Sequence, residues 1–159
     1  MIDKRYLACK IISGYSNILH DTMKTGQKAW TYSPKKPPMP KVPDDLKEEM
    51  ETKAKELIES FLKPEHIKTP SEDMQFNYVV DIYTEWYRSY FYFCAKYASS
   101  GPNAISPFFE TKFARMEYVG DGLFNLSYMR HTGKWFELFQ DLSLDECLEA
   151  IKDYPHFLP

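Results

Sequence analysis

Two glycine-marked turns between segments of alternating hydrophobicity constrain the fold of this chain most strongly, and both lie between Phe108 and Gln140. The first is Gly120-Asp121-Gly122, and the second spans residues 130–134 and contains Gly133. Glycine and aspartate tolerate the positive φ angles that tight turns between antiparallel strands require. The sequence therefore predicts three consecutive antiparallel strands joined by two hairpins.

The strands that flank the first turn are each expected to have one buried face. Apolar and polar residues alternate through residues 114–118 and again through residues 124–128. This alternation is typical of a strand with one face on a core and one face in water. Arg115 and Glu117, two positions apart, are therefore expected on the same polar face.

An aromatic-rich segment precedes these hairpins. Residues 74–98 combine a high density of β-forming aromatic residues with period-two alternation at their start, which predicts two further strands with a turn at Arg88-Ser89. A helix is the alternative, because aromatic residues in this segment also recur at intervals of three and four.

Two helices are predicted on either side of the strands. Residues 45–62 carry an apolar stripe at helical spacing, with Asp45 and Glu48 resembling a capping box and Pro64 expected to end the helix. Residues 143–151 form a second amphipathic segment, which begins with a capping box of Ser143 and Glu146. After it, the C-terminal tail is expected to fold back through Phe157.

The domain organisation follows from these elements. We expect an N-terminal helical arm over residues 1–32, a proline-rich linker over residues 33–43 and a single α+β domain over residues 44–159. The predicted domain is a five-stranded antiparallel meander with helices packed on one face. This architecture is similar to the cystatin and NTF2-like folds, a likeness of fold that assigns no function.

Composition excludes several classes of function. The formal net charge is −3, so the general positive field of a nucleic-acid-binding protein is absent. Cys9, Cys94 and Cys147 lack the CxxC spacing of zinc and redox sites and are expected to be reduced thiols. The sequence shows no membrane span, signal peptide, metal signature or cofactor-binding motif. We therefore predict a cytoplasmic protein without a metal or cofactor and without membrane or nucleic-acid partners.

Candidate ligand-binding residues come from the two hairpins and the first strand. Arg130 and His131 stand at the second turn beside Trp135, where a cationic, titratable group could hold an anion. Arg115, Glu117 and Asp81 are further charged residues of the predicted sheet that could join a polar network. The alternative interpretation is a capped turn and an exposed, charge-paired sheet surface.

Partner binding is the second hypothesis about the surface. With helices on one face only, part of the aromatic segment must lie on the other face, and exposed aromatic residues often mediate dimerisation. The candidate interface residues are Tyr83, Trp86, Tyr90 and Tyr92. The linker from Pro34 to Pro43 contains overlapping PxxP spacings and is a further candidate for binding a protein partner, although a stiff spacer is the simpler interpretation.

The C-terminal three quarters of the chain resemble a family of small bacterial proteins of no assigned function. The resemblance rests on the segments FARMEYVGDG, FNLSYMRHTGKW and LSLDECLEAI, followed by Tyr154-Pro155-His156-Phe157, and covers about residues 43–159. It implies a bacterial cytoplasmic setting and assigns a role to no residue.

The sequence therefore supports two hypotheses about function. The first is a non-enzymatic interaction domain that self-associates, as a homodimer, through an aromatic-rich sheet. The alternative is a small-ligand-binding protein or pocket enzyme on a cone-shaped sheet that uses an Arg/His/Glu cluster. No catalytic motif is found, so the sequence leaves open whether the protein is an enzyme.

Overall fold

The structure is a computed structural model that describes residues 40–68, 76–100 and 104–159. Residues from Pro40 to Pro159 form one compact unit. The predicted N-terminal helix and the linker up to residue 39 lie outside the described residues.

The unit contains a single five-stranded sheet in the order β1-β2-β3-β4-β5, with every neighbouring pair antiparallel. The meander predicted from the sequence is thereby confirmed, and the alternative of a helix over residues 74–98 is wrong. The strands are β1 (Tyr78–Tyr87), β2 (Tyr90–Ala98), β3 (Phe108–Gly120), β4 (Leu123–Met129) and β5 (Trp135–Leu142).

The three hairpin turns lie where the sequence predicts them. Gly120 has a φ of 112° and Gly133 a φ of 73°, conformations that L side chains rarely adopt. In the β1–β2 hairpin the turn is Arg88-Ser89, and Arg88 itself takes a positive φ of 59°. Local turn chemistry therefore sets the register of the meander.

The helix that precedes the sheet differs from the prediction at both ends. α2 (Asp44–Leu57) follows Pro43 and has no side-chain cap, so the proposed capping box of Asp45 and Glu48 is wrong. Pro64 does not end the helix, because a π-helical segment, η1 (Ile58–Leu62), precedes α3 (Lys63–His66). Proline lacks an amide hydrogen and clashes with the carbonyl four residues earlier, and the wider π turn accommodates both defects.

The helix that follows the sheet begins as predicted. α4 (Leu144–Asp153) has the full capping box: the Glu146 amide donates to Ser143 Oγ at 3.4 Å, and the Ser143 amide donates to Glu146 Oε2 at 2.8 Å. A short 3-10 turn, η2 (Pro155–Phe157), returns the chain to the sheet, where Phe157 is fully buried. The prediction that the tail folds back is confirmed.

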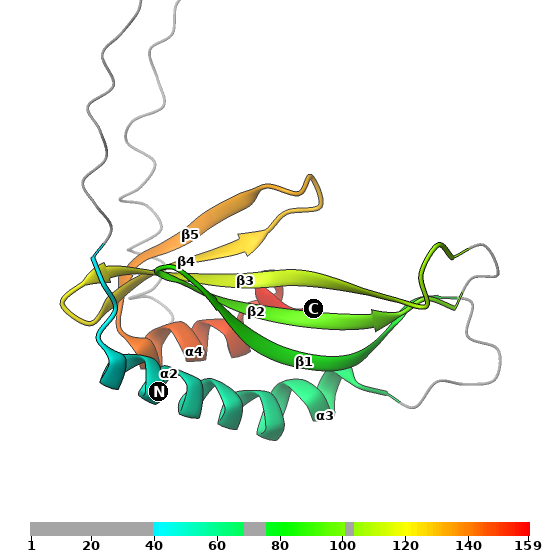
Figure 1. Ribbon diagram of the computed structural model, residues 1–159, viewed down its shortest axis with the longest axis horizontal. Helices are drawn as coiled ribbons and strands as arrows, with labels where there is room; N and C mark the ends of the chain where they lie inside the picture. The colour runs from blue at the N-terminus through cyan, green and yellow to red at the C-terminus, as the bar shows by residue number, and fades with distance from the viewer. Residues whose placement is uncertain (1–39, 69–75, 101–103) are drawn as a thin grey trace, which may run out of the picture. The chain divides into compact units, whose positions relative to one another are not determined.

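α2, α3 and α4 all lie on one side of the sheet, which we call the helix-covered face (Figure 1). Large apolar side chains from the helices and from alternate strand positions fill the space between the two layers. The largest of these core residues are Met50, Leu62, Ile82, Phe91, Phe93, Met116, Phe124, Leu126, Phe139, Leu142, Ile151 and Phe157. None of the helices in the described part of the chain is long and apolar enough to cross a membrane.

Candidate functional site

The other side of the sheet, which we call the helix-free face, carries a row of side chains in register across all five strands. Antiparallel pairing aligns Glu85, Tyr92, Arg115, Ser127 and Glu137, one from each strand in order. Neighbouring positions on the same side complete the face. Its members are Tyr83, Glu85, Tyr87, Tyr90, Tyr92, Cys94, Lys112, Arg115, Glu117, Asn125, Ser127, Trp135 and Glu137.

Arg115 of β3 stands at the centre of the helix-free face between two aromatic rings. Its guanidinium carbon lies 4.8 Å from the ring centroid of Tyr90 and 4.8 Å from that of Trp135. One terminal nitrogen, Nη2, donates to Ser127 Oγ at 3.3 Å. Cations over aromatic rings are stabilised by the ring quadrupole, so the two rings hold the guanidinium in a fixed place.

The contact between Trp135 and Tyr92 shows that the sheet curls toward this face. The two ring centroids are 5.6 Å apart although the residues lie on β5 and β2, with β3 and β4 between them. Neighbouring strands are about 4.8 Å apart, so a flat sheet would separate these backbones by about 14 Å. Figure 1 shows the cause, since the β4–β5 hairpin rises away from the helices toward its tip.

Glu117 lies two residues beyond Arg115 on the same face. Tyr90 donates its hydroxyl hydrogen to Glu117 Oε1 at 3.4 Å. Burial, together with the nearby Glu117 charge, raises the pKa of Tyr90, so this hydroxyl stays protonated as a donor. None of the ion pairs between described residues includes Arg115 or Glu117, so one cation and one anion at the centre of the face lack a charged partner within 4.0 Å.

Lys112 is a charged residue of this face that the sequence did not indicate. Its ammonium nitrogen lies 4.3 Å from the Tyr92 ring centroid and 2.9 Å from Glu85 Oε2, and the hydrogen bond to Glu85 raises its pKa. Simple alternation would place Lys112 and Arg115, three residues apart, on opposite faces. A β-bulge between the Phe93 and Cys94 pairings corrects this. The sign of this bulge in the sequence is the pair of consecutive apolar residues Phe113-Ala114, which interrupts the alternation of apolar and polar residues.

The helix-free face is closed by its own side chains. Tyr92, Cys94 and Ser127 are only 8%, 1% and 0% exposed although no described helix covers them. Burial raises the pKa of the Cys94 thiol to about 11, so this thiol is protonated at neutral pH and is a poor nucleophile. Burial likewise raises the pKa of Tyr83, to which a hydrogen bond with Glu110 contributes. The face is therefore a packed layer and does not form a deep pocket.

Several candidates from the sequence lie elsewhere. Arg130 lies over the Phe136 ring, 5.6 Å from its centroid, and His131 is exposed at the tip of the β4–β5 hairpin. Asp81 pairs with Lys63 of α3 at 3.1 Å, and Trp86 packs on Phe91 of the helix-covered face at 4.7 Å between centroids.

The structure thus brings together part of each set of candidates from the sequence. The ligand candidates on the helix-free face are Arg115, Glu117 and Trp135. The interface candidates on the same face are Tyr83, Tyr90 and Tyr92.

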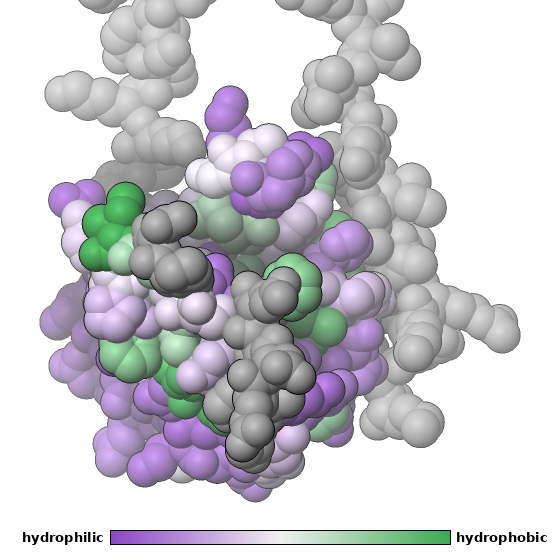
Figure 2. Space-filling model, turned by 90° about the vertical axis from the view of Figure 1, so that its right-hand side faces the viewer, coloured by the Kyte–Doolittle hydropathy of each residue, from purple (hydrophilic) through white to green (hydrophobic). Residues whose placement is uncertain are grey.

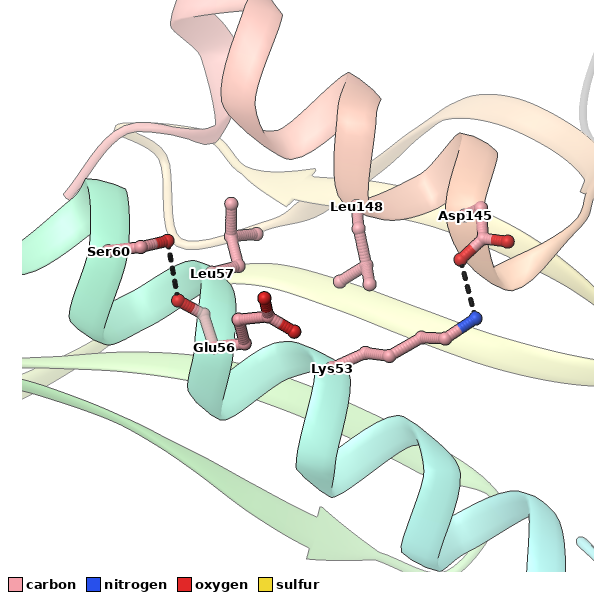
Figure 3. Close-up of a pocket in the computed structure, with 6 residues that line it drawn as sticks. All are labelled: Lys53, Glu56, Leu57, Ser60, Asp145 and Leu148. Carbon is pink, nitrogen blue, oxygen red and sulfur yellow. Dashed lines mark hydrogen bonds and ion pairs between the residues drawn. The ribbon is translucent and has the colours of Figure 1, made fainter.

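A second surface feature is a groove between α2, η1 and α4 with a volume of about 320 Å³ (Figure 3). Its lining residues are Lys53, Glu56, Leu57, Ser60, Asp145 and Leu148. Lys53 is held between Asp145 at 2.7 Å and Glu49 at 2.9 Å, and Ser60 donates to the Glu56 carbonyl at 2.6 Å. The groove's cation is therefore already neutralised by the protein.

A third feature is an apolar end of the sheet, where β2 ends and β1 and β3 begin (Figure 1). Phe76 and Ile105 are 80% and 106% exposed there, and Phe109 stacks on Tyr97 with centroids 5.1 Å apart. Figure 2 shows hydrophobic residues at the surface of this end, interspersed with hydrophilic ones. Residues 69–75 and 101–103 lie outside the described residues.

The residues that the structure describes include no group of three or more His, Cys, Asp and Glu side chains placed to hold a metal ion. The helix-free face therefore stands out as the place where charge, aromatic surface and burial converge.

Comparison with protein families identifies one match. Residues 41–159 match the model of a family described as a domain of unknown function, DUF3024. This agrees with the resemblance to an uncharacterised family that the sequence indicates over about the same residues. The searches of curated proteins and of solved structures found no match.

Proposed function

The chain belongs to the DUF3024 family, whose function is unknown, and from the geometry we propose that it is a non-enzymatic interaction domain. Its helix-free face binds a folded protein partner. The observation that carries this proposal is the pair Arg115 and Glu117, two opposite charges set among aromatic side chains without a charged partner among the described residues. The partner must therefore present both an acidic and a basic side chain within an apolar or aromatic surface.

The composition of the face supports a protein partner over other classes. Arginine, tyrosine and tryptophan are enriched where protein interfaces gain most of their affinity, and the three types meet here at Arg115, Tyr90 and Trp135. The charged residues of the face are Lys112, Arg115, Glu85, Glu117 and Glu137, so it carries no excess of positive charge. A nucleic-acid-binding face would instead concentrate positive charge.

The cellular setting belongs to the same proposal. We place the protein in the bacterial cytoplasm. Cys94 is a buried free thiol, as expected for a protein kept in a reducing compartment.

Site-specific photo-crosslinking in the cells that naturally express the protein tests the interaction. A photoreactive phenylalanine replaces Tyr87, which belongs to the helix-free face and is 52% exposed, in the full chain. We expect one defined protein adduct, and we expect it to disappear when Arg115→Ala is added. The matched control carries the same probe at Lys55, an exposed position of α2. An equal adduct at Lys55, or none at Tyr87, would overturn the proposal.

A small anionic ligand at Arg115 is the second candidate, and one observation favours it. The Nε atom of Arg115 is buried and has no hydrogen-bond acceptor among the described residues. Buried donors are usually satisfied, so a carboxylate or phosphate group could complete this guanidinium. Native mass spectrometry of the gently purified full chain checks this. A defined extra mass that Arg115→Met abolishes supports the ligand, and a bare chain excludes it.

A further inference from the structure

The helix-free face is complementary to itself, which is the basis of an inference that rests on the proposed function and names the partner. Arg115 and Glu117 project from the central strand, β3, on the same side and are separated by one residue. Positions two apart on a strand are about 6.7 Å apart. A second copy of the chain thus offers both of the charges that this face lacks, at the same spacing.

Only some arrangements of two such faces bring opposite charges together. A two-fold axis that runs between two stacked sheets, parallel to their strands, places Arg115 over Arg115 of the second copy. A two-fold axis that instead runs between the sheets and across the strands, at the level of Met116, reverses the direction of β3 in the second copy. Arg115 of each copy then faces Glu117 of the other. In an isologous interface each such contact occurs in both directions.

The same axis also matches the neighbouring strand β2. On β2, Tyr92 pairs with Arg115 and Tyr90 pairs with Glu117, so the rotation sets Tyr90 against Tyr92 of the second copy. On β4 the fully buried Ser127 offers no surface to the second copy, so the match rests on β2 and β3. Aromatic rings of β2 thereby meet aromatic rings of the second copy.

We propose that two copies of this chain pair through their helix-free faces about this axis, with two reciprocal ion pairs between Arg115 and Glu117. Lys112 and Glu85, already paired at 2.9 Å, lie beside this centre and take no part in the reciprocal exchange. The partner is therefore a second folded copy.

Charge reversal in two separate chains tests the reciprocity. Arg115→Glu alone and Glu117→Arg alone each oppose like charges at both contacts, and we expect the dimer of each single variant to weaken at least about tenfold. An equimolar mixture of the two variants restores both ion pairs in a heterodimer. The measurement is sedimentation velocity on the full chain under reducing conditions, over a concentration series. We expect the mixture to associate within about threefold of the wild type.

Glu51→Arg and Lys55→Glu, at exposed positions of α2, provide the matched control and should leave association unchanged. Circular dichroism establishes that each variant is folded. If a charge reversal prevents folding, Glu117→Gln replaces it, and we then expect weaker association that depends less on salt concentration.

Three results would overturn the inference: a monomeric wild type, single variants that dimerise as tightly as the wild type, or an equimolar mixture that associates no more tightly than the single variants. A Tyr87 adduct to a different protein, or to the same chain's own N-terminal residues, would also exclude a second copy as the partner. The adduct to a different protein would leave the proposed function standing, whereas the absence of any adduct would remove that too.

Discussion

β2 contributes to both faces of the sheet, and its two sides are buried in different ways. Toward the helices it presents Phe91 and Phe93, which are 1% and 0% exposed under an apolar layer. Toward the other side it presents Tyr90 and Tyr92, which lie against Arg115, Lys112 and Trp135 with no described helix above them. One side is closed by packing against another element, and the other by the curl of the sheet and the length of its own side chains.

This difference separates stability from recognition. Burial of apolar surface on the helix-covered face is non-directional and roughly proportional to area, so it stabilises the fold without specifying a partner. On the helix-free face, polar groups lose water and gain little unless each finds a partner in the right geometry. The helix-free face is thus better suited to specificity than to stability, and the predictions below test that division.

The largest effect is expected on the helix-covered face. Phe93→Ala removes a fully buried ring that contacts Phe91 and Phe113 and should lower the free energy of unfolding by about 3–5 kcal/mol. Urea denaturation measures the change. Tyr87→Ala, an aromatic truncation on the helix-free face at a 52% exposed position, is the control and should cost about 1 kcal/mol or less. Equal losses for the two variants would contradict the division between the faces.

The next effect concerns alkaline pH and the helix-free face. Burial raises the pKa of Cys94 from an ordinary value of 9.0 to about 11. The unfolded chain therefore releases this proton at a lower pH than the folded chain does. The stabilisation from Cys94 is complete below pH 9 and is lost as the pH rises to about 11.

Two pH units correspond to about 2–3 kcal/mol, so the free energy of unfolding should fall by about that amount more in the wild type than in Cys94→Ala. Urea denaturation at several pH values between 8 and 11 measures the two slopes. The cavity in Cys94→Ala lowers the free energy of unfolding by the same amount at every pH, so it does not affect the comparison of slopes. Parallel curves would show that the helix-free face does not seal Cys94 from water.

A smaller effect distinguishes the two main helices. Ser143 caps α4 through a hydrogen bond from the Glu146 amide, so Ser143→Ala should lower the free energy of unfolding by about 1 kcal/mol. α2 has no side-chain cap, and Asp45→Ala should cost only the helix-dipole contribution, about 0.3–1 kcal/mol. Chemical denaturation of both variants checks this order. A larger loss for Asp45→Ala would indicate that Asp45 caps α2, contrary to the structure.

Much of the fold was predictable because its determinants are local. The turns at Gly120 and Gly133 depend on residues within the turn, and the α4 capping box depends on Ser143 and Glu146 alone. The aromatic segment was predictable as two strands because its alternation agrees with its β propensity. Such signals involve few neighbours and survive in any compact context.

The remaining features depend on contacts distant in sequence. The bulge that places Lys112 on the same face as Arg115 appears only when β3 pairs with β2. The π-helical segment before Pro64 lets the helix continue, although proline alone predicts its end. Trp135 reaches Tyr92 because the sheet curls, which no single strand encodes. Arg115, Glu117 and Trp135 could thus be nominated from the sequence, but their meeting with the tyrosines could not.

The smallest expected effect concerns the ion pair between Glu85 and Lys112 on the helix-free face. Glu85→Gln removes the ion pair with Lys112, two side chains that are 46% and 38% exposed. Ion pairs of this exposure contribute about 0.2–1 kcal/mol, and ions at 1 M screen them. The loss in the free energy of unfolding should therefore be below about 1 kcal/mol at low salt and should vanish in 1 M NaCl, whereas the loss from Phe93→Ala persists.

Urea denaturation at both salt concentrations, with the two variants side by side, measures this contrast. If Glu85→Gln cost more than about 2 kcal/mol, the charged network of the helix-free face would be part of what holds the domain together. The charges of this face would then serve mainly to stabilise the fold. The positions of Arg115 and Glu117 would have to be explained by their contribution to stability and not by a binding partner.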